Sequence, residues 1–119
     1  MRIFVSYTKH NDDLKPDLEL STQAIKDKLS LLGDVFMDYP LHEPSRVWDE
    51  LDRCDVFVLI KSDKNSKSKW MVEERKRAEV NFKIIVELSY FELLNIKDED
   101  LTKMIRDSNS KSNLQIQSK

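Results

Sequence analysis

Four short apolar runs limit the folds that are open to this chain, because each is continuous rather than alternating with polar residues. Unbroken runs of three to five residues, rich in β-branched side chains, are typical of strands that are covered on both faces, as in a parallel sheet. The runs lie at residues 3–5, 35–37, 56–60 and 84–86. We therefore predict four parallel strands at these positions.

Helical periodicity lies between the first two runs. Apolar residues spaced by three, four or seven positions form one stripe of a predicted helix. Pro16 suits the first turn of this helix, and Gly33 suits the position just past its end. The stripe consists of Leu14, Leu18, Ile25, Leu29 and Leu32.

Later segments are also predicted to be helical. We expect a helix at residues 45–53 with Ser45 as its N-cap, and another at residues 70–81 with Ser68 as a cap. Residues 90–96 and 98–106 can both form helices. Strands and helices thus alternate, which predicts an α/β fold: a doubly wound parallel sheet of four or five strands with helices on both faces.

The 119 residues are enough for one domain only, since two would each be too small to bury a core. We place this domain at residues 1–107 and interpret residues 108–119 as a polar, frayed tail. An alternation of polar and apolar residues at 113–117 is the alternative there, as a short edge strand.

Composition excludes several classes of protein. One Cys and two well-separated His argue against a disulfide framework or a Cys/His zinc site, so we expect no metal. A net charge of −2 argues against nucleic acid as the main partner. No apolar run approaches the roughly 20 residues that span a bilayer, so we expect no membrane association and a cytoplasmic location. With a single Gly, the chain has no glycine-rich phosphate loop.

Basic residues are concentrated in the second half, where residues 61–119 carry 13 basic and 10 acidic side chains. This excess is either an ordinary solvated face or a collar that draws an anionic small molecule towards a cleft. The basic side chains near its start are Lys61, Lys64, Lys67, Lys69, Arg75, Lys76 and Arg77.

Ligands of doubly wound sheets bind beyond the carboxyl ends of the strands. Among the residues expected there, Glu74 differs from its neighbour Glu73. Residues three and four positions from Glu73 are mostly basic, whereas those around Glu74 are mostly apolar, so Glu74 is predicted to face inward. A buried carboxylate has either a structural partner, such as Arg77 or a strand-end hydroxyl, or a chemical role.

The sequence resembles the Toll/interleukin-1 receptor (TIR) domain family in four segments that occur in the expected order within residues 1–88. FVSYTKHND at residues 4–12 is similar to the first strand of that family, and GDVFMD at residues 33–38 to its second. WDEL and RCDVFVLI within residues 48–60 resemble its next helix and third strand. SKWMVEE at residues 68–74 resembles its S-x-W-C-x-x-E motif.

The resemblance implies a flavodoxin-like sheet and, in enzymatic members, cleavage of NAD at the nicotinamide–ribose bond. The Glu four residues after the Trp is required for that reaction, and this position is Glu74. NAD would be a substrate rather than a cofactor, the product ADP-ribose or a cyclic ADP-ribose signal, and the setting antiphage defence. We expect Glu74 to be catalytic, and the predicted substrate-binding residues are Ser6, Tyr7, Asp38, Tyr39, Lys61 and Trp70.

Two other functions remain open from the sequence. Some members of the family have no chemistry and act as scaffolds that bind other TIR domains or copies of themselves. A nucleoside deoxyribosyltransferase-like enzyme shares the fold and uses a carboxylate nucleophile on a sugar, although the W-x-x-x-E arrangement of Trp70 and Glu74 favours the NAD-cleaving interpretation. Trp70 itself either anchors its helix to the sheet or shapes the pocket.

Overall fold

The predicted strands form one parallel sheet in the order β2-β1-β3-β4. The structure is a computed structural model and describes residues 1–15, 17–39 and 42–117, with side chains as far as residue 109. Each of the four apolar runs lies within a strand, and every neighbouring pair is parallel. The strands are β1 (Arg2–Ser6), β2 (Asp34–Met37), β3 (Val56–Ile60) and β4 (Ile84–Leu88).

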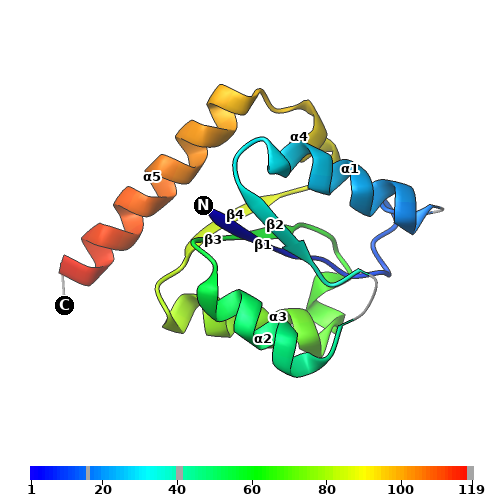
Figure 1. Cartoon of the computed structure of the whole chain (residues 1–119), viewed down its shortest axis with the longest axis horizontal. Helices are drawn as coiled ribbons and strands as arrows, with labels where there is room; N and C mark the ends of the chain where they lie inside the picture. Colours follow the sequence, from blue (N-terminus) through cyan, green and yellow to red (C-terminus); the bar gives the residue numbers. More distant parts are fainter. Residues whose placement is uncertain (16, 40–41, 118–119) are drawn as a thin grey trace.

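Helices cover both faces of the sheet (Figure 1). One face is covered by α1 (Leu18–Ser30), α4 (Tyr90–Asn95) and the start of α5 (Asp98–Gln117). The other face is covered by α2 (Pro44–Arg53) and α3 (Lys69–Val80). The strand order and the two helical layers are those of a flavodoxin-like α/β fold, with four strands in the part of the chain that the structure describes.

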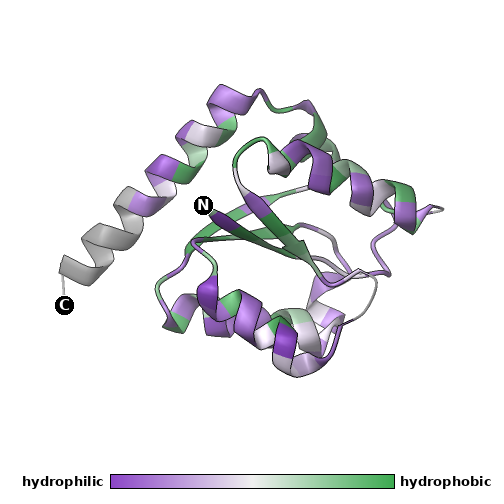
Figure 2. Cartoon of the chain, in the orientation of Figure 1, coloured by the Kyte–Doolittle hydropathy of each residue, from purple (hydrophilic) through white to green (hydrophobic). Residues whose placement is uncertain are grey.

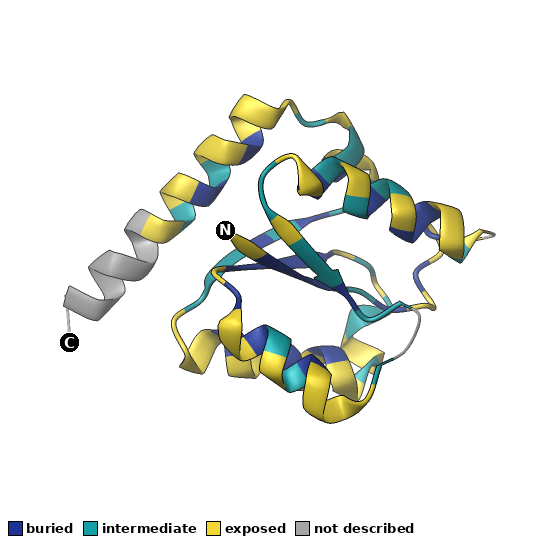
Figure 3. Cartoon of the chain, in the orientation of Figure 1, coloured by how far each residue is buried: buried dark blue, intermediate teal, exposed yellow. Residues whose placement is uncertain are grey.

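Burial explains why the strand runs are continuously apolar. All five residues of β3 are buried, and successive side chains enter opposite cores. Phe57 packs towards α2 and α3, where its ring stacks on Phe4 with centroids 5.7 Å apart. Figures 2 and 3 show the result, since the strands are both the most apolar and the most buried part of the chain.

Residues at the ends of the helices explain where two of them begin. The Ser68 Oγ accepts a hydrogen bond from the backbone N–H of Met71 at 3.3 Å, which confirms the predicted cap of α3. In α2 the prediction was wrong, because Pro44 is already helical and Ser45 lies two positions after the N-cap, Glu43. Pro has no N–H and a fixed φ, so it suits this first position without a side-chain cap.

The segment before α1 is not helical as far back as the periodicity predicted. Leu14 is fully buried but lies in a turn, where its backbone N–H donates to the carbonyl of Asn11 at 3.1 Å. The Asn11 side chain forms this turn by accepting from the N–H of Asp13 at 2.9 Å. The helix begins at Leu18 after Asp17, which caps it. Pro16, predicted for the first turn, lies outside the described residues.

Gly33 has a different role from the one predicted. The helix α1 ends at Ser30, three residues before Gly33, and Gly33 has no positive φ. A Cβ at this position would lie 2.3 Å from the carbonyl oxygen of Met1. The same carbonyl accepts a hydrogen bond from Asp34 N at 2.9 Å, so the close approach of the two chains is what requires glycine here.

The last helix extends beyond the predicted break at residue 107. Helix α5 runs to Gln117, so residues 108–117 continue a helix rather than form a separate tail or an edge strand. Leu101 and Ile105 are buried in the core beside β4, and acidic residues occupy the first turn. Once such contacts have formed the first turns, each further residue adds one hydrogen bond without a new nucleation cost. Within the described residues, no helix is long and apolar enough to cross a bilayer.

Candidate active site

Glu74 lies on the buried face of α3, as its helical spacing predicted. Its side chain is only 3% exposed, and Met71 and Ala78 are buried on the same face. The neighbouring Glu73 is exposed. The difference follows from geometry, because adjacent helical residues point about 100° apart and only one of the two can face the sheet.

The carboxylate of Glu74 contacts the end of β1. The Ser6 Oγ donates a hydrogen bond to Glu74 Oε1 at 2.8 Å, and Ser6 is itself 1% exposed. Of the two structural partners considered from the sequence, the strand-end hydroxyl is therefore the one found. Arg77 is engaged elsewhere, with its guanidinium bound to both carboxylate oxygens of Asp52 at 2.7 Å.

One neutral hydroxyl compensates only partly for the burial of a carboxylate. Desolvation is the main reason that the pKa of Glu74 is raised to about 7, and the nearby Asp38 charge raises it further. Hydrogen bonding from Ser6 and from the Trp70 side chain acts in the opposite direction. Near neutral pH the group is therefore divided between its protonated and ionised forms, a property that is concentrated at functional sites.

Two further predicted residues, Tyr7 and Asp38, meet beside this carboxylate at the ends of β1 and β2. The Tyr7 hydroxyl donates to the backbone carbonyl of Asp38 at 3.0 Å. Burial, followed by the Asp38 charge, raises the pKa of Tyr7 above its usual value, so its hydroxyl stays protonated. The Asp38 carboxylate accepts from the backbone N–H of His42 at 2.7 Å and lies 3.1 Å from His42 Nδ1.

Tyr39 and Trp70 border the same region. Tyr39 is half-buried, and its carbonyl accepts a hydrogen bond from Lys26 Nζ at 3.2 Å. Trp70 is 37% exposed and packs on Trp48 with ring centroids 4.8 Å apart. Trp70 is thus not a core residue; it is the partly exposed member of the contact with Glu74.

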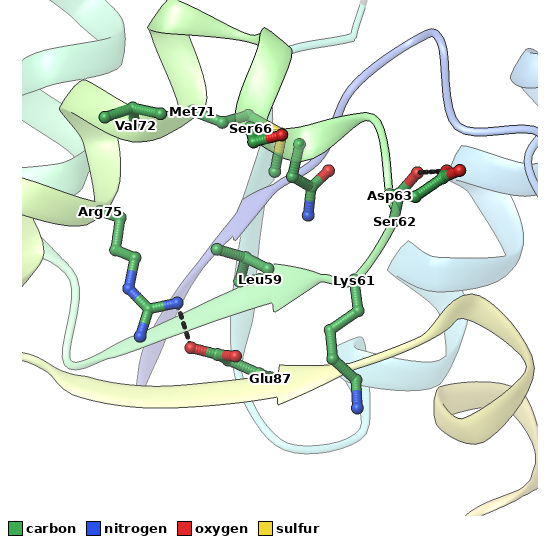
Figure 4. Close-up of a pocket in the computed structure, with 10 residues that line it drawn as sticks. Leu59, Lys61, Ser62, Asp63, Ser66, Met71, Val72, Arg75 and Glu87 are labelled. Atoms are coloured by element: carbon green, nitrogen blue, oxygen red, sulfur yellow. Dashed lines mark hydrogen bonds and ion pairs between the residues drawn. The ribbon is translucent and has the colours of Figure 1, made fainter.

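Lys61 is separated from the other predicted site residues. Its Nζ lies 3.3 Å from the carboxylate of Glu92. It also lines a cavity of about 510 Å³ (Figure 4), in which Arg75 contacts Glu87 over an apolar floor that includes Leu59. The α3 residues that line this cavity are Met71, Val72 and Arg75, and Glu87 of β4 lines it with them, whereas Trp70 packs on Trp48 of α2.

The predicted residues therefore form one group with a single exception. Ser6, Tyr7, Asp38, Tyr39 and Trp70 gather with Glu74, while Lys61 pairs with Glu92 of α4 and lines the cavity beside β4. Sequence reasoning placed Lys61 with them because it follows a strand. It could not show that the side chain of Lys61 would turn towards α4, where it pairs with Glu92.

One contact near the site was missed from the sequence. His42 is not among the predicted site residues, yet its backbone N–H and its Nδ1 both face the Asp38 carboxylate. The spacing of four residues between Asp38 and His42 was the available signal. Among the described side chains, no three His, Cys, Asp or Glu residues converge in a way that could hold a metal ion.

No protein-family model matches this chain, and no curated protein matches it significantly.

Proposed function

We propose that this protein is a TIR-like enzyme that cleaves NAD between nicotinamide and ribose, with Glu74 as the catalytic carboxylate. The observation that carries the proposal is a carboxylate that is 3% exposed, has a pKa of about 7 and lies at the carboxyl edge of a flavodoxin-like sheet. Its position four residues after Trp70 is the one that the family resemblance assigns to catalysis. A cytoplasmic location and a role in antiphage defence belong to the same proposal.

The proposed chemistry needs one ionised carboxylate. The bond between ribose C1′ and the pyridinium nitrogen breaks, its electron pair goes to nicotinamide, and the sugar becomes an oxocarbenium-like cation. An anion in a site with little water opposes that charge efficiently, and water or an internal nucleophile then attacks C1′. No general acid is required, because nicotinamide leaves as a neutral molecule.

The hydrogen bond from Ser6 suits this role. It holds Oε1 at 2.8 Å and favours the ionised form, while a carboxylate has capacity for further donors. A ribose hydroxyl can use that capacity. Because Glu74 is 3% exposed, the sugar reaches it only after a covering side chain moves, and Trp70 is the partly exposed neighbour in contact with it.

The direct test is release of nicotinamide from NAD by the purified protein, measured by chromatography up to high protein concentrations. Release that depends on Glu74 supports the proposal. Absence of nicotinamide, together with base exchange between deoxyinosine and adenine, would instead identify a deoxyribosyltransferase-like enzyme. Absence of both activities, with binding to a second TIR domain or to itself, would identify a scaffold.

The pH dependence of the rate follows from the pKa of Glu74. The ionised form is the active one, so kcat/KM is expected to rise with pH, with an apparent pKa near 7, and to level off above it. In the complex, the cationic nicotinamide ring favours the ionised carboxylate. The acid limb of kcat should therefore lie at lower pH than that of kcat/KM. A rate that falls as pH rises from 6 to 8 would contradict this assignment.

Two substitutions distinguish the group around Glu74 from the rest of the carboxyl edge. Ser6→Ala removes a bond that lowers the pKa of Glu74, so the acid limb should move to higher pH and the rate at pH 7 should fall about three- to tenfold. The loss should largely disappear at pH 9. Lys61→Ala should change kcat/KM by less than about twofold, because the Lys61 side chain pairs with Glu92 and lines the other cavity. Equal losses in the two variants, measured as complete pH profiles, would refute this division.

A further inference from the structure

A second cavity lies at the carboxyl ends of β1 and β3, where the order in which strands are added to the sheet reverses. In the order β2-β1-β3-β4, the chain passes from β1 to one side to form β2, and β3 lies on the other side of β1. The loops after β1 and β3 therefore diverge from a common edge (Figure 1). Such a switch point is the general place for a ligand in an open α/β sheet.

The cavity between these two loops has a volume of about 440 Å³, which is within the usual range for small-molecule sites. We refer to it as the switch-point cavity. Its lining comes from the loop that follows β1 and from the segment between β3 and α3, which includes the short 3₁₀ helix Asn65–Lys67. The lining residues are Thr8, His10, Asp12, Lys15, Lys64, Lys67 and Ser68.

Positive charge prevails in this lining, with three Lys against one Asp. Asp12 lies 3.9 Å from Lys15, and both side chains are more than half exposed, so this pair neutralises little. Lys64 and Lys67 form no ion pair with any side chain that the structure describes. Among the described side chains, these two ammonium groups thus lie at one cavity without a carboxylate partner, and their field attracts an anion.

Hydroxyl groups add neutral donors to the cavity. The Thr8 Oγ1 accepts from the N–H of His10 at 3.2 Å, and Thr8 is only 5% exposed. The Ser68 Oγ accepts from the N–H of Met71 at 3.3 Å. Each oxygen is used as an acceptor, so each hydroxyl proton remains available for donation to a ligand. Ammonium and hydroxyl donors around one hollow are the set that recognises phosphate oxygens.

We propose that the switch-point cavity binds the phosphate groups of a small phosphorylated ligand, with Lys64 and Lys67 as the main contacts. Of the basic side chains that are in excess in the second half of the chain, Lys64 and Lys67 would then be the ones that attract an anion, rather than part of an ordinary solvated face. The inference rests on the cavity and its charges. It holds whether or not the protein cleaves NAD, because it concerns binding alone.

The test is a titration with inorganic pyrophosphate and, in parallel, with ADP and adenosine, followed by calorimetry and by NMR amide shifts. Pyrophosphate and ADP should bind saturably, shift the amides of Thr8 and Ser68, and weaken as salt is raised. Tighter binding of ADP than of pyrophosphate would identify a nucleotide as the ligand, and equal binding would identify the phosphates alone. Adenosine, which lacks phosphate, should not shift these amides.

The variant K64Q/K67Q should weaken pyrophosphate binding by about tenfold or more, since both unpaired charges are removed. The matched control K97Q/K103Q removes the same total charge from exposed positions near the start of α5 and should keep the affinity within about twofold. No saturable binding to the wild-type protein, or equal losses in the two variants, would overturn the proposal. Glu74→Gln should bind pyrophosphate normally, so failure here is distinguishable from failure of the proposed activity.

Discussion

Replacing Glu74 by Gln is expected to reduce nicotinamide release from NAD by at least about 100-fold while the protein stays folded. The amide has nearly the shape of the carboxyl group and its oxygen can still accept from Ser6, so the 2.8 Å contact with β1 can persist. What it cannot do is carry the negative charge that opposes an oxocarbenium-like cation. The measurement is initial rate at pH 8, where the wild-type carboxylate is mostly ionised.

The adjacent carboxylate provides the matched control. Glu73→Gln removes the same charge from the same helix at an exposed position, so its rate should remain within about twofold of the wild type. Circular dichroism spectra of the two variants should superimpose. A Glu74→Gln protein that is folded and turns over NAD at the wild-type rate would eliminate the proposed mechanism.

Glu74→Gln, which should lower the activity, should raise the stability of the folded protein at pH 8. The pKa of Glu74 is about 7 in the folded protein, compared with 4.5 for an unperturbed Glu. Between pH 4.5 and 7 the folded state holds a proton on Glu74 that the unfolded state has lost. The contribution of Glu74 to the free energy of unfolding is therefore fully present below pH 4.5 and is lost as pH rises through 7. A difference of about 2.5 pKa units corresponds to about 3 kcal/mol.

Glu74→Gln is neutral at every pH and does not lose this contribution. At pH 8 the variant should therefore be more stable than the wild type by up to about 3 kcal/mol, or roughly 10 °C in Tm for a chain of this size. At pH 4.5 the two should unfold almost together. The measurement is urea or thermal unfolding of both proteins at several pH values.

Comparing the two proteins removes the contributions of the other titrating groups, which they share. Glu73→Gln should follow the wild-type pH dependence, because Glu73 is exposed. If Glu74→Gln were instead less stable than the wild type at pH 8, the carboxylate would be a structural partner of Ser6 and not a group held in its ionised form for chemistry. An inactive but more stable variant is the pattern expected when a site is maintained at the expense of stability.

The strands could be predicted well because their signal is local. A run such as residues 56–60 is apolar throughout only if both faces of the strand are covered, and that requirement nearly dictates a parallel sheet with two helical layers. The inward orientation of Glu74 was equally accessible, since the positions of neighbours on one helix follow from 3.6 residues per turn. Both predictions depend on geometry within a single element.

Predictions at the ends of elements were less successful. Leu14 continues the apolar stripe of α1, yet Asn11 turns the chain there and Leu14 is buried from a loop. Burial of a Leu contributes similar free energy from a helix or from a turn, so periodicity does not separate the two. The start of α2 was misplaced for a related reason, because both Pro44 and Ser45 are suited to a helix N-terminus.

The sequence alone determined the alternating α/β architecture, the inward face of α3 and the identity of the one carboxylate on it. Only the tertiary structure decided that this carboxylate meets Ser6, Tyr7 and Asp38 while Lys61 pairs with Glu92 of α4, and that Lys64 and Lys67 share a cavity with Thr8. The physical reason is the sequence separation of the residues that interact. Hydrophobic periodicity depends on neighbours within one element, whereas a site depends on how separate elements pack against each other, which the pattern of each element does not specify.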